Sequence, residues 1–225
     1  MRVWGLRGTL QESFRHVRTW RARRHWARVD QAFDNEFGVD TAGIVPLQAL
    51  TIASSNKELG HRYQAADADS FRALMGGLAV PADGLTFIDL GAGKGRAMLL
   101  ASEHPFRRVV GVEFAPALCD VARRNVEVFD SPAQQCDEFE VVCADAAEYE
   151  LPDEPSLVFI HNSFEDPLMR SVLAGIRRSA DERPRRLLLL LVNRRLEQAE
   201  LTRAGWQKVS SHEYGELYEP APATA

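Results

Sequence analysis

The feature of this 225-residue chain that most constrains its fold is the segment TFIDLGAGKGR at residues 86–96. A short apolar run with β propensity meets three glycines, Gly91, Gly93 and Gly95, and a helical pattern follows at once. Glycines at this spacing let the backbone turn sharply out of a strand and lie close to a ligand, because no Cβ intervenes. The start of the following helix presents unpaired N–H groups over the same loop. The segment therefore predicts a strand–loop–helix unit with a ligand site at the loop.

The spacing of these glycines restricts the ligand. A dinucleotide-binding fingerprint reads G-x-G-x-x-G, but the position three after Gly93 is Arg96. A phosphate-binding P-loop reads G-x-x-x-x-G-K-[ST], and Lys94 lacks that frame. An NAD(P)-dependent oxidoreductase is therefore disfavoured, whereas a purely structural glycine turn stays open for the loop taken alone.

Four predicted strands in succession carry a polar side chain at or next to their ends, at Asp89, Glu113, Asp145 and Asn162. Open α/β sheets bind ligands at the carboxyl ends of their strands, where the strand order switches. Glu113, at the end of the second strand, can accept hydrogen bonds from both ribose hydroxyls of an adenosine. Asp145 could accept from the adenine amino group, with the Ala146 N–H facing a ring nitrogen. The four together predict a nucleoside site, although a solvated strand-end acid is the alternative for any one of them.

Strands and helices alternate along most of the chain. Strands are expected at residues 86–90, 107–113, 139–145, 156–161, 186–192, 206–212 and 216–219, and helices at 68–79, 96–103, 115–129, 167–178 and 196–203. The leucine run in 186–192 is typical of a strand buried on both faces of a parallel sheet. We therefore predict an α/β fold: a Rossmann-like, doubly wound, mostly parallel seven-stranded sheet with helices on both faces, plus an N-terminal helical extension. An apolar content of 45% is enough for one substantial core.

Charge is distributed unevenly along the chain. The net charge of −5 and the pI of about 5.7 give no global electrostatic reason for binding nucleic acid. Residues 1–29 hold eight arginines and one glutamate, a net charge of +7, so the remainder carries −12. A basic helix with tryptophans, predicted over residues 9–33, can bind RNA, an anionic membrane surface or an acidic partner. The alternative, which we favour, is a helix packed on the domain with its arginines solvated.

The number of cysteines and the hydropathy of the chain indicate in which cellular compartment the protein is expected. The three cysteines are an odd number without a C-x-x-C pair, which argues against a disulfide framework or a zinc site, so no metal is expected. No apolar run reaches the roughly 18 residues of a transmembrane helix, and the N-terminus lacks the apolar stretch of a signal peptide. We therefore expect a cytoplasmic protein with reduced thiols.

The segment FGVDTAG at residues 37–43 precedes the first strand and has the composition of a loop. It could fold over the ligand as a lid, with Asp40 and Thr41 contacting it. It could equally be a turn in which Asp40 caps local backbone. Both interpretations stay open on the residues alone.

With these motifs the chain resembles class I methyltransferases that use S-adenosylmethionine (SAM). More narrowly, it is similar to a bacterial group with FD…GVDT…G ahead of DLG[SA]GKGR and a GVE second strand; the similarity covers about residues 33–195. The arrangement also resembles the non-SET histone lysine methyltransferases, whose fourth strand ends in Asn-Asn-Phe. Here the positions read Asn162-Ser163-Phe164, and Ser163 also departs from the Asn-Pro-Phe of the bacterial group.

The resemblance implies SAM as the cofactor. We expect residues 66–220 to form the SAM-binding methyltransferase domain, residues 1–65 the basic N-terminal helix and lid-like loop, and residues 221–225 a disordered tail. The cofactor-binding residues implied are Asp89, Gly91, Ala92, Gly93, Gly95, Glu113, Asp145, Ala146, Asn162, Asp40 and Thr41.

Methyl transfer from SAM requires a nucleophile held in line with the S–CH₃ bond. The side-chain carbonyl of Asn162 could orient an amine, Phe164 could wall the transfer channel, and Glu165 is the better acid or base candidate. His161 is expected to point to the opposite face of the sheet from Asn162. These residues favour a nitrogen acceptor on a protein or small molecule. The alternatives are an RNA methyltransferase that uses the Arg-rich helix, and a catalytically inactive SAM-binding or scaffold protein, which the serine at 163 leaves open.

Overall fold

The computed structural model describes residues 28–78, 82–193 and 196–222. Its centre is a seven-stranded sheet with the order β5-β4-β3-β6-β7-β9-β8. The strands are β3 (Thr86–Leu90), β4 (Arg108–Glu113), β5 (Phe139–Cys143), β6 (Ser156–His161), β7 (Leu187–Val192), β8 (Trp206–His212) and β9 (Gly215–Pro220). Strands β3 to β7 are parallel, whereas β9 runs antiparallel to both β7 and β8. The predicted Rossmann-like, mostly parallel seven-stranded sheet is confirmed.

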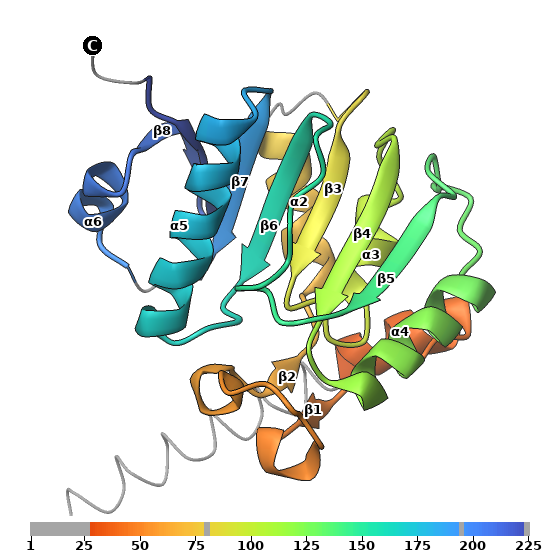
Figure 1. Cartoon of the computed structure of the whole chain (residues 1–225). Coiled ribbons are helices and arrows are strands. Elements are labelled where there is room, and N and C mark those ends of the chain that lie inside the picture. Colours follow the sequence, from red (N-terminus) through yellow and green to blue (C-terminus); the bar gives the residue numbers. More distant parts are fainter. Residues whose placement is uncertain (1–27, 79–81, 194–195, 223–225) are drawn as a thin grey trace, which may run out of the picture.

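Helices cover both faces of this sheet (Figure 1). They are α2 (Ala68–Gly77), α3 (Arg96–Ala101), α4 (Pro116–Val128), α5 (Asp166–Glu182) and α6 (Gln198–Arg203), and a helix that ends at residue 37 precedes them. Figure 1 shows α5 in front of the sheet and α2 and α3 behind it. Because parallel strands need crossover connections, the β–α alternation of the sequence leads directly to this layered arrangement.

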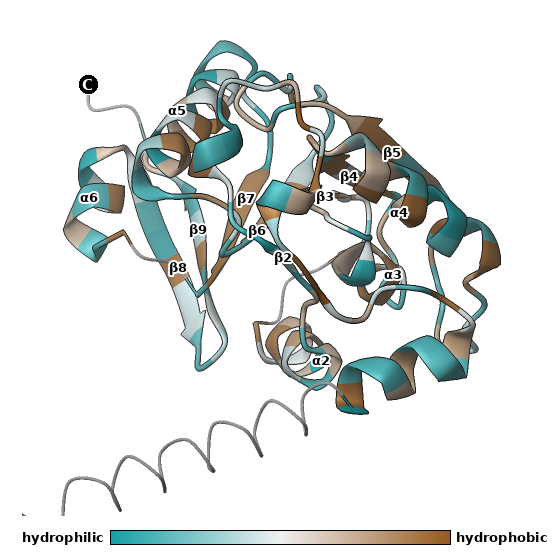
Figure 2. Cartoon of the chain, turned by 90° about the horizontal axis from the view of Figure 1, so that it is seen from below, coloured by the Kyte–Doolittle hydropathy of each residue, from teal (hydrophilic) through white to brown (hydrophobic). Residues whose placement is uncertain are grey.

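Two hydrophobic cores form, one on each face of the sheet. Neighbouring residues of one strand point to opposite faces, so Phe87 packs with α2 and α3 while Ile88 packs with α5. The buried stripe of α5 has helical spacing and consists of Leu168, Met169, Val172, Leu173, Ile176, Ser179 and Ala180. Figure 2 shows hydrophobic residues on the central strands β6 and β7 and a largely hydrophilic β8 at the edge of the sheet.

The strand order reverses between β3 and β6, which lie side by side although they are not consecutive in the chain. The connections from β3 and from β6 therefore leave in opposite directions, and a crevice opens at the carboxyl ends of these two strands. Figure 1 shows residues 44–64 lying at this edge of the sheet. The fold thus places the glycine loop after β3, Glu113 and the residues after β6 around one crevice.

Several boundaries differ from those predicted. Helix α5 runs on to Glu182 rather than ending at residue 178. Strand β5 ends at Cys143, so Asp145 lies two residues beyond the strand. The region predicted as a loop holds a short antiparallel pair, β1 (Ile44–Val45) with β2 (Tyr63–Gln64), and the 3-10 turns η1 (Leu47–Ala49) and η2 (Lys57–Leu59). Of the helix predicted over residues 9–33, all but its last part lies outside the described residues.

Candidate functional site

The three glycines of the loop after β3 have the backbone conformation that a sharp turn out of a strand requires. Gly91, Gly93 and Gly95 have φ angles of 91°, 58° and 88°, in the left-handed region that side chains with a Cβ disfavour. The N–H groups of Gly91 and Ala92 donate to the Val112 carbonyl at 2.9 and 3.1 Å, which anchors the loop on β4. Gly95 then caps the N-terminus of α3. The loop is therefore held rigidly at the switch point between β3 and β6.

Glu113 ties the glycine loop to the end of β4. Its carboxylate accepts from the N–H groups of Gly93 and Ala115, both at 2.9 Å. Burial raises the pKa of the Glu113 carboxyl, although these backbone donors act in the opposite direction. Each carboxylate oxygen has a second lone pair, so the group retains capacity to accept from two hydroxyls. This is the geometry expected of a residue that binds a ribose.

Asp145 is fixed at the neighbouring strand end. Its Oδ1 accepts from the Ala147 N–H at 2.9 Å, and its Oδ2 accepts from Asn56 Nδ2 at 2.9 Å and from the Ser54 hydroxyl. Burial would raise the pKa of the Asp145 carboxyl, but these donors outweigh it and the pKa lies below its usual value. The residue therefore carries a negative charge at the mouth of the crevice.

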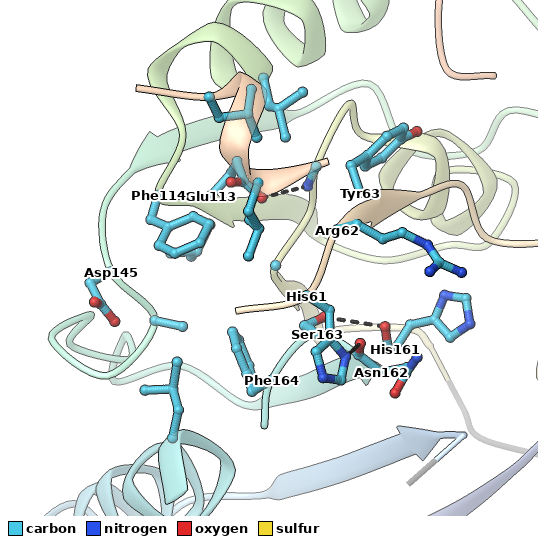
Figure 3. A pocket seen from close by; sticks show the side chains of 18 of the residues that line it. His61, Arg62, Tyr63, Glu113, Phe114, Asp145, His161, Asn162, Ser163 and Phe164 are labelled. Atoms are coloured by element: carbon cyan, nitrogen blue, oxygen red, sulfur yellow. Dashed lines mark hydrogen bonds between the residues drawn. The ribbon is translucent and has the colours of Figure 1, made fainter. Parts of the chain in front are cut away.

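A cavity connects these groups. It is lined by Gly91, Gly93, Glu113, Phe114, Asp145, Ala146, His161, Asn162, Ser163 and Phe164 from the strand ends, and by residues of the 44–64 segment. Figure 3 shows Asp145 and Phe114 at one end and His161 and Asn162 at the other, with Glu113 and Phe164 between them. The cavity thus joins the predicted adenosine side to the predicted acceptor side. Predicted residues that do not line it are Asp40, Thr41, Asp89, Ala92, Gly95 and Glu165.

Residues 44–64, which we call the roof segment, close the cavity from above the loop. The Gly60 backbone pairs with that of Phe164, the His61 N–H donates to the Ser163 carbonyl at 3.0 Å, and the Glu165 N–H donates to the Leu59 carbonyl at 2.8 Å. The Tyr63 ring lies so close to Gly93 that a Cβ on this glycine would overlap it. The roof segment is therefore attached to the loop after β6 and packed on the glycine loop.

The predicted lid, FGVDTAG, makes mainly structural contacts. Thr41 is fully buried; its N–H and hydroxyl donate to the Asp34 carboxylate at 2.9 and 2.6 Å, and its hydroxyl also accepts from Arg96. Asp40 is exposed and pairs with Lys94 at 2.7 Å. The backbone of this turn is capped by Asp34, which accepts from the N–H groups of Thr41 and Ala42, and not by Asp40 as the turn interpretation had it. A contact of either residue with the cofactor stays a prediction.

The residues after β6 are arranged around His61, which the sequence analysis did not single out. His61 Nδ1 lies 2.6 Å from the Asn162 carbonyl and Nε2 lies 2.9 Å from Glu165 Oε1. Asn162 itself is exposed and has a φ of 48°. Nothing in the local pattern links position 61 to position 165, because the pairing of two loops leaves no periodicity in the sequence.

The surroundings of His161 agree with its expected orientation, opposite to that of Asn162. Its ring lies 6.3 Å from that of Phe159, and it lines a cavity beside α2, whereas Asn162 lines a separate small cavity with Met169 of α5. Both residues also line the cavity between the strand ends. Burial lowers the pKa of His161, with the nearby Asp67 acting in the opposite direction. His161 Nε2 lies 3.2 Å from Asn193 Nδ2 at the end of β7.

Comparison with known proteins supports the class of enzyme. Residues 87–182 match the family model described as a methyltransferase domain. No curated protein matches the chain.

Two solved structures show the extent of the likeness in fold. The glycopeptide N-methyltransferase MtfA complexed with S-adenosyl-L-homocysteine (SAH) is 15% identical, with a TM-score of 0.50 over 70% of this chain and 88% of that chain. A predicted N6-adenine-specific DNA methylase from Listeria monocytogenes is 11% identical, with a TM-score of 0.52 over 70% of this chain and 52% of that chain. The family match and the fold together identify residues 87–182 as the core of a SAM-dependent methyltransferase domain, the enzyme class and cofactor predicted from the sequence.

Proposed function

We propose that this methyltransferase transfers the methyl group of SAM to a nitrogen atom, an amine of a protein or of a small molecule. The observation that carries the proposal is the course of the cavity. It runs from the acids Glu113 and Asp145 to the polar side chains of His161 and Asn162, at the sheet's switch point. An adenosine bound at the acids would direct the rest of the cofactor toward the polar end.

The residues present fit SAM. Glu113 offers two fixed carboxylate oxygens to ribose hydroxyls, and Asp145 with the adjoining Ala146 N–H suits the adenine edge. Gly91 and Gly93 line the cavity, and the absence of a Cβ lets Ser163 and Tyr63 pack directly against the glycine loop that forms its floor. When bound, SAM supplies a methyl group on a sulfonium, which is already an excellent leaving group.

The chain's own residues have to position the acceptor and exclude water. We assign the orienting role to Asn162, whose amide oxygen can accept from an amine N–H, and the wall of the transfer channel to Phe164, which is buried at the cavity. Glu165, paired with His61, lies outside the cavity lining. We therefore propose for Glu165 a positioning role through the roof segment rather than direct proton transfer.

Two measurements test the proposal. Calorimetry should show binding of SAM and SAH and no binding of NAD. Binding of NAD without binding of SAM would contradict the methyltransferase assignment.

Asn162→Ala should reduce turnover by about 10²-fold, as expected when a positioning group is lost, and its SAM affinity should stay within a few-fold of wild type. Asn35→Ala, at an exposed asparagine outside the cavity lining, is the matched control. Full activity of Asn162→Ala, or a product methylated on oxygen or carbon, would contradict the nitrogen assignment.

The two rival functions give different outcomes in the same assay. Incubation with radiolabelled SAM and a fractionated lysate should label protein or small amines. Label in RNA that disappears on deleting residues 1–27 would favour the RNA methyltransferase. SAM binding without label in any fraction would favour an inactive SAM-binding or scaffold protein.

A further inference from the structure

A second cavity of about 290 Å³ lies beside the cofactor cavity. It is enclosed by α2, the ends of β6 and β7, the turn between β8 and β9, and Asp30 of the preceding helix; its polar lining residues are Asp30, Gln64, Asp67, Ser70, His161, Asn193 and Tyr214. Its apolar wall is formed mainly by Phe71, Leu74 and Phe159. A cavity in which polar groups converge opposite an apolar wall can hold a small ligand group that has an apolar and a polar part.

The two cavities adjoin at His161 and Gln64, which line both. In Figure 3 His161 is at the end of the cofactor cavity opposite Asp145. A cofactor with its adenosine at Glu113 and Asp145 would therefore extend toward the entrance of the second cavity. The second cavity is thus placed where a methyl acceptor has to lie.

The charges of this second cavity favour a cation. Asp30 and Asp67 are its carboxylates, and no lysine or arginine of the described residues lines it. Asp30 is partly compensated by Arg96, whose Nη1 lies 3.5 Å from Asp30 Oδ1. Asp67 caps α2 through Oδ1 alone, which accepts from the Ser70 N–H and hydroxyl. Its Oδ2 is therefore the carboxylate oxygen with capacity for a ligand.

His161 can move a proton at the junction of the cavities. Its burial lowers the pKa of the imidazole, so the ring is neutral near pH 7 and has one unprotonated nitrogen. The Asn193 amide beside Nε2 can present either its NH₂ group or its oxygen, so the ring has a partner before and after it takes up a proton. The titratable groups that share the second cavity with it are Asp30, Asp67 and Tyr214.

We propose that the second cavity binds the methyl acceptor as an aliphatic ammonium group, with Asp67 binding the cation and His161 accepting its proton. This inference rests on the proposed nitrogen acceptor and specifies its class: a primary or secondary alkylamine, either free or as a lysine side chain. The alkyl part would lie against Phe71, Leu74 and Phe159. An aromatic amine or an adenine base, neutral at pH 7, would gain nothing from Asp67.

The transfer balances with these groups. The ammonium gives one proton to a ring nitrogen of His161, and the freed lone pair forms a bond to the methyl carbon. The bond from that carbon to sulfur breaks, and its electron pair stays on the sulfur. The products are SAH and a methylated ammonium, and the imidazolium returns its proton to solvent. No further reactant is required.

The first test measures binding without turnover. Hexylamine and Nα-acetyl-lysine amide are titrated into the SAH-loaded full chain by calorimetry, and a lysine-containing peptide series forms the third arm. Asp67→Asn keeps a side chain that can cap α2 but removes the charge, and it should weaken amine binding at least tenfold with SAH affinity unchanged. Asp69→Asn, an exposed residue of the same helix, is the matched control and should change neither. Equal amine binding in Asp67→Asn and wild type would overturn the inference.

The second test uses the pH dependence of turnover. His161→Gln should lower kcat near pH 7 by about 10²-fold or more, the usual contribution of a general base. Activity should recover as pH rises toward the pKa of the amine, because the acceptor then arrives neutral. A pH profile identical to wild type would exclude His161 as the base. If SAM binds neither wild type nor any variant, the proposed function itself is wrong. If N-methylation occurs and neither Asp67→Asn nor His161→Gln changes it, only the assignment of the second cavity as the acceptor site is wrong.

Discussion

At the scale of single residues, the buried carboxyl of Asp89 makes the free energy of unfolding depend on pH. It lies on β3 directly under the glycine loop, and burial, followed by the nearby Glu113, raises its pKa to about 8. In the unfolded chain the carboxyl loses its proton near its usual pKa of 3.8. Between these values the folded protein holds one proton more than the unfolded chain, so the free energy of unfolding falls as pH rises.

Asp89→Asn removes this linkage. Between pH 5 and 7, the free energy of unfolding of wild type should fall with rising pH more steeply than that of the variant, both without cofactor. The difference between the two slopes should be about 1.4 kcal/mol per pH unit, the value for one proton. Urea unfolding at several pH values measures it. Asp69→Asn, which is exposed, should keep the wild-type slope. Parallel curves for Asp89→Asn and wild type would mean that the Asp89 carboxyl is ionised in the folded protein.

At the scale of elements, the segment before the sheet shows what the sequence could and could not predict. The glycine loop, the parallel strands and the ends occupied by Glu113 and Asn162 follow from local spacing and periodicity, and they were predicted. The roof segment was not, because its stability comes from contacts over about a hundred residues, such as His61 with Glu165. The second cavity was missed for the same reason: Asp67 and His161 meet only in three dimensions.

The predicted lid gives a prediction at this scale. Thr41→Val should lower the free energy of unfolding by about 1–3 kcal/mol, since the Asp34 carboxylate and Arg96 lose a buried partner. Its SAM affinity should stay unchanged. Asp40→Ala, the control in the same segment, removes only an ion pair whose aspartate is exposed and should cost about 1 kcal/mol or less. Calorimetry measures SAM affinity and thermal unfolding measures stability for both variants. A large loss of SAM affinity with unchanged stability would favour the lid interpretation over the structural turn.

At the scale of the whole molecule, the charge is divided between the N-terminal residues and the rest. Residues 1–29 carry +7 and the remainder −12, and nearly all of the basic stretch lies outside the described residues. No helix of the described part is long and apolar enough to cross a membrane. An acceptor cavity with two carboxylates and a separate basic segment would suit an acceptor that has a cationic reactive group and an anionic body.

Deleting residues 1–27 tests this division of roles. If the arginines bind an anionic part of the acceptor, the truncated protein should keep its SAM affinity and its activity on hexylamine, but lose activity on the natural acceptor. Raising the salt concentration should reproduce that loss in the full chain, because attraction between exposed charges is screened over about 10 Å at 0.1 M ionic strength. Activity that is insensitive to both deletion and salt would show that the basic stretch has no part in acceptor binding. Insoluble truncated protein would show that it packs on the domain, the outcome we favour from the sequence, since its tryptophans need apolar surface to cover them.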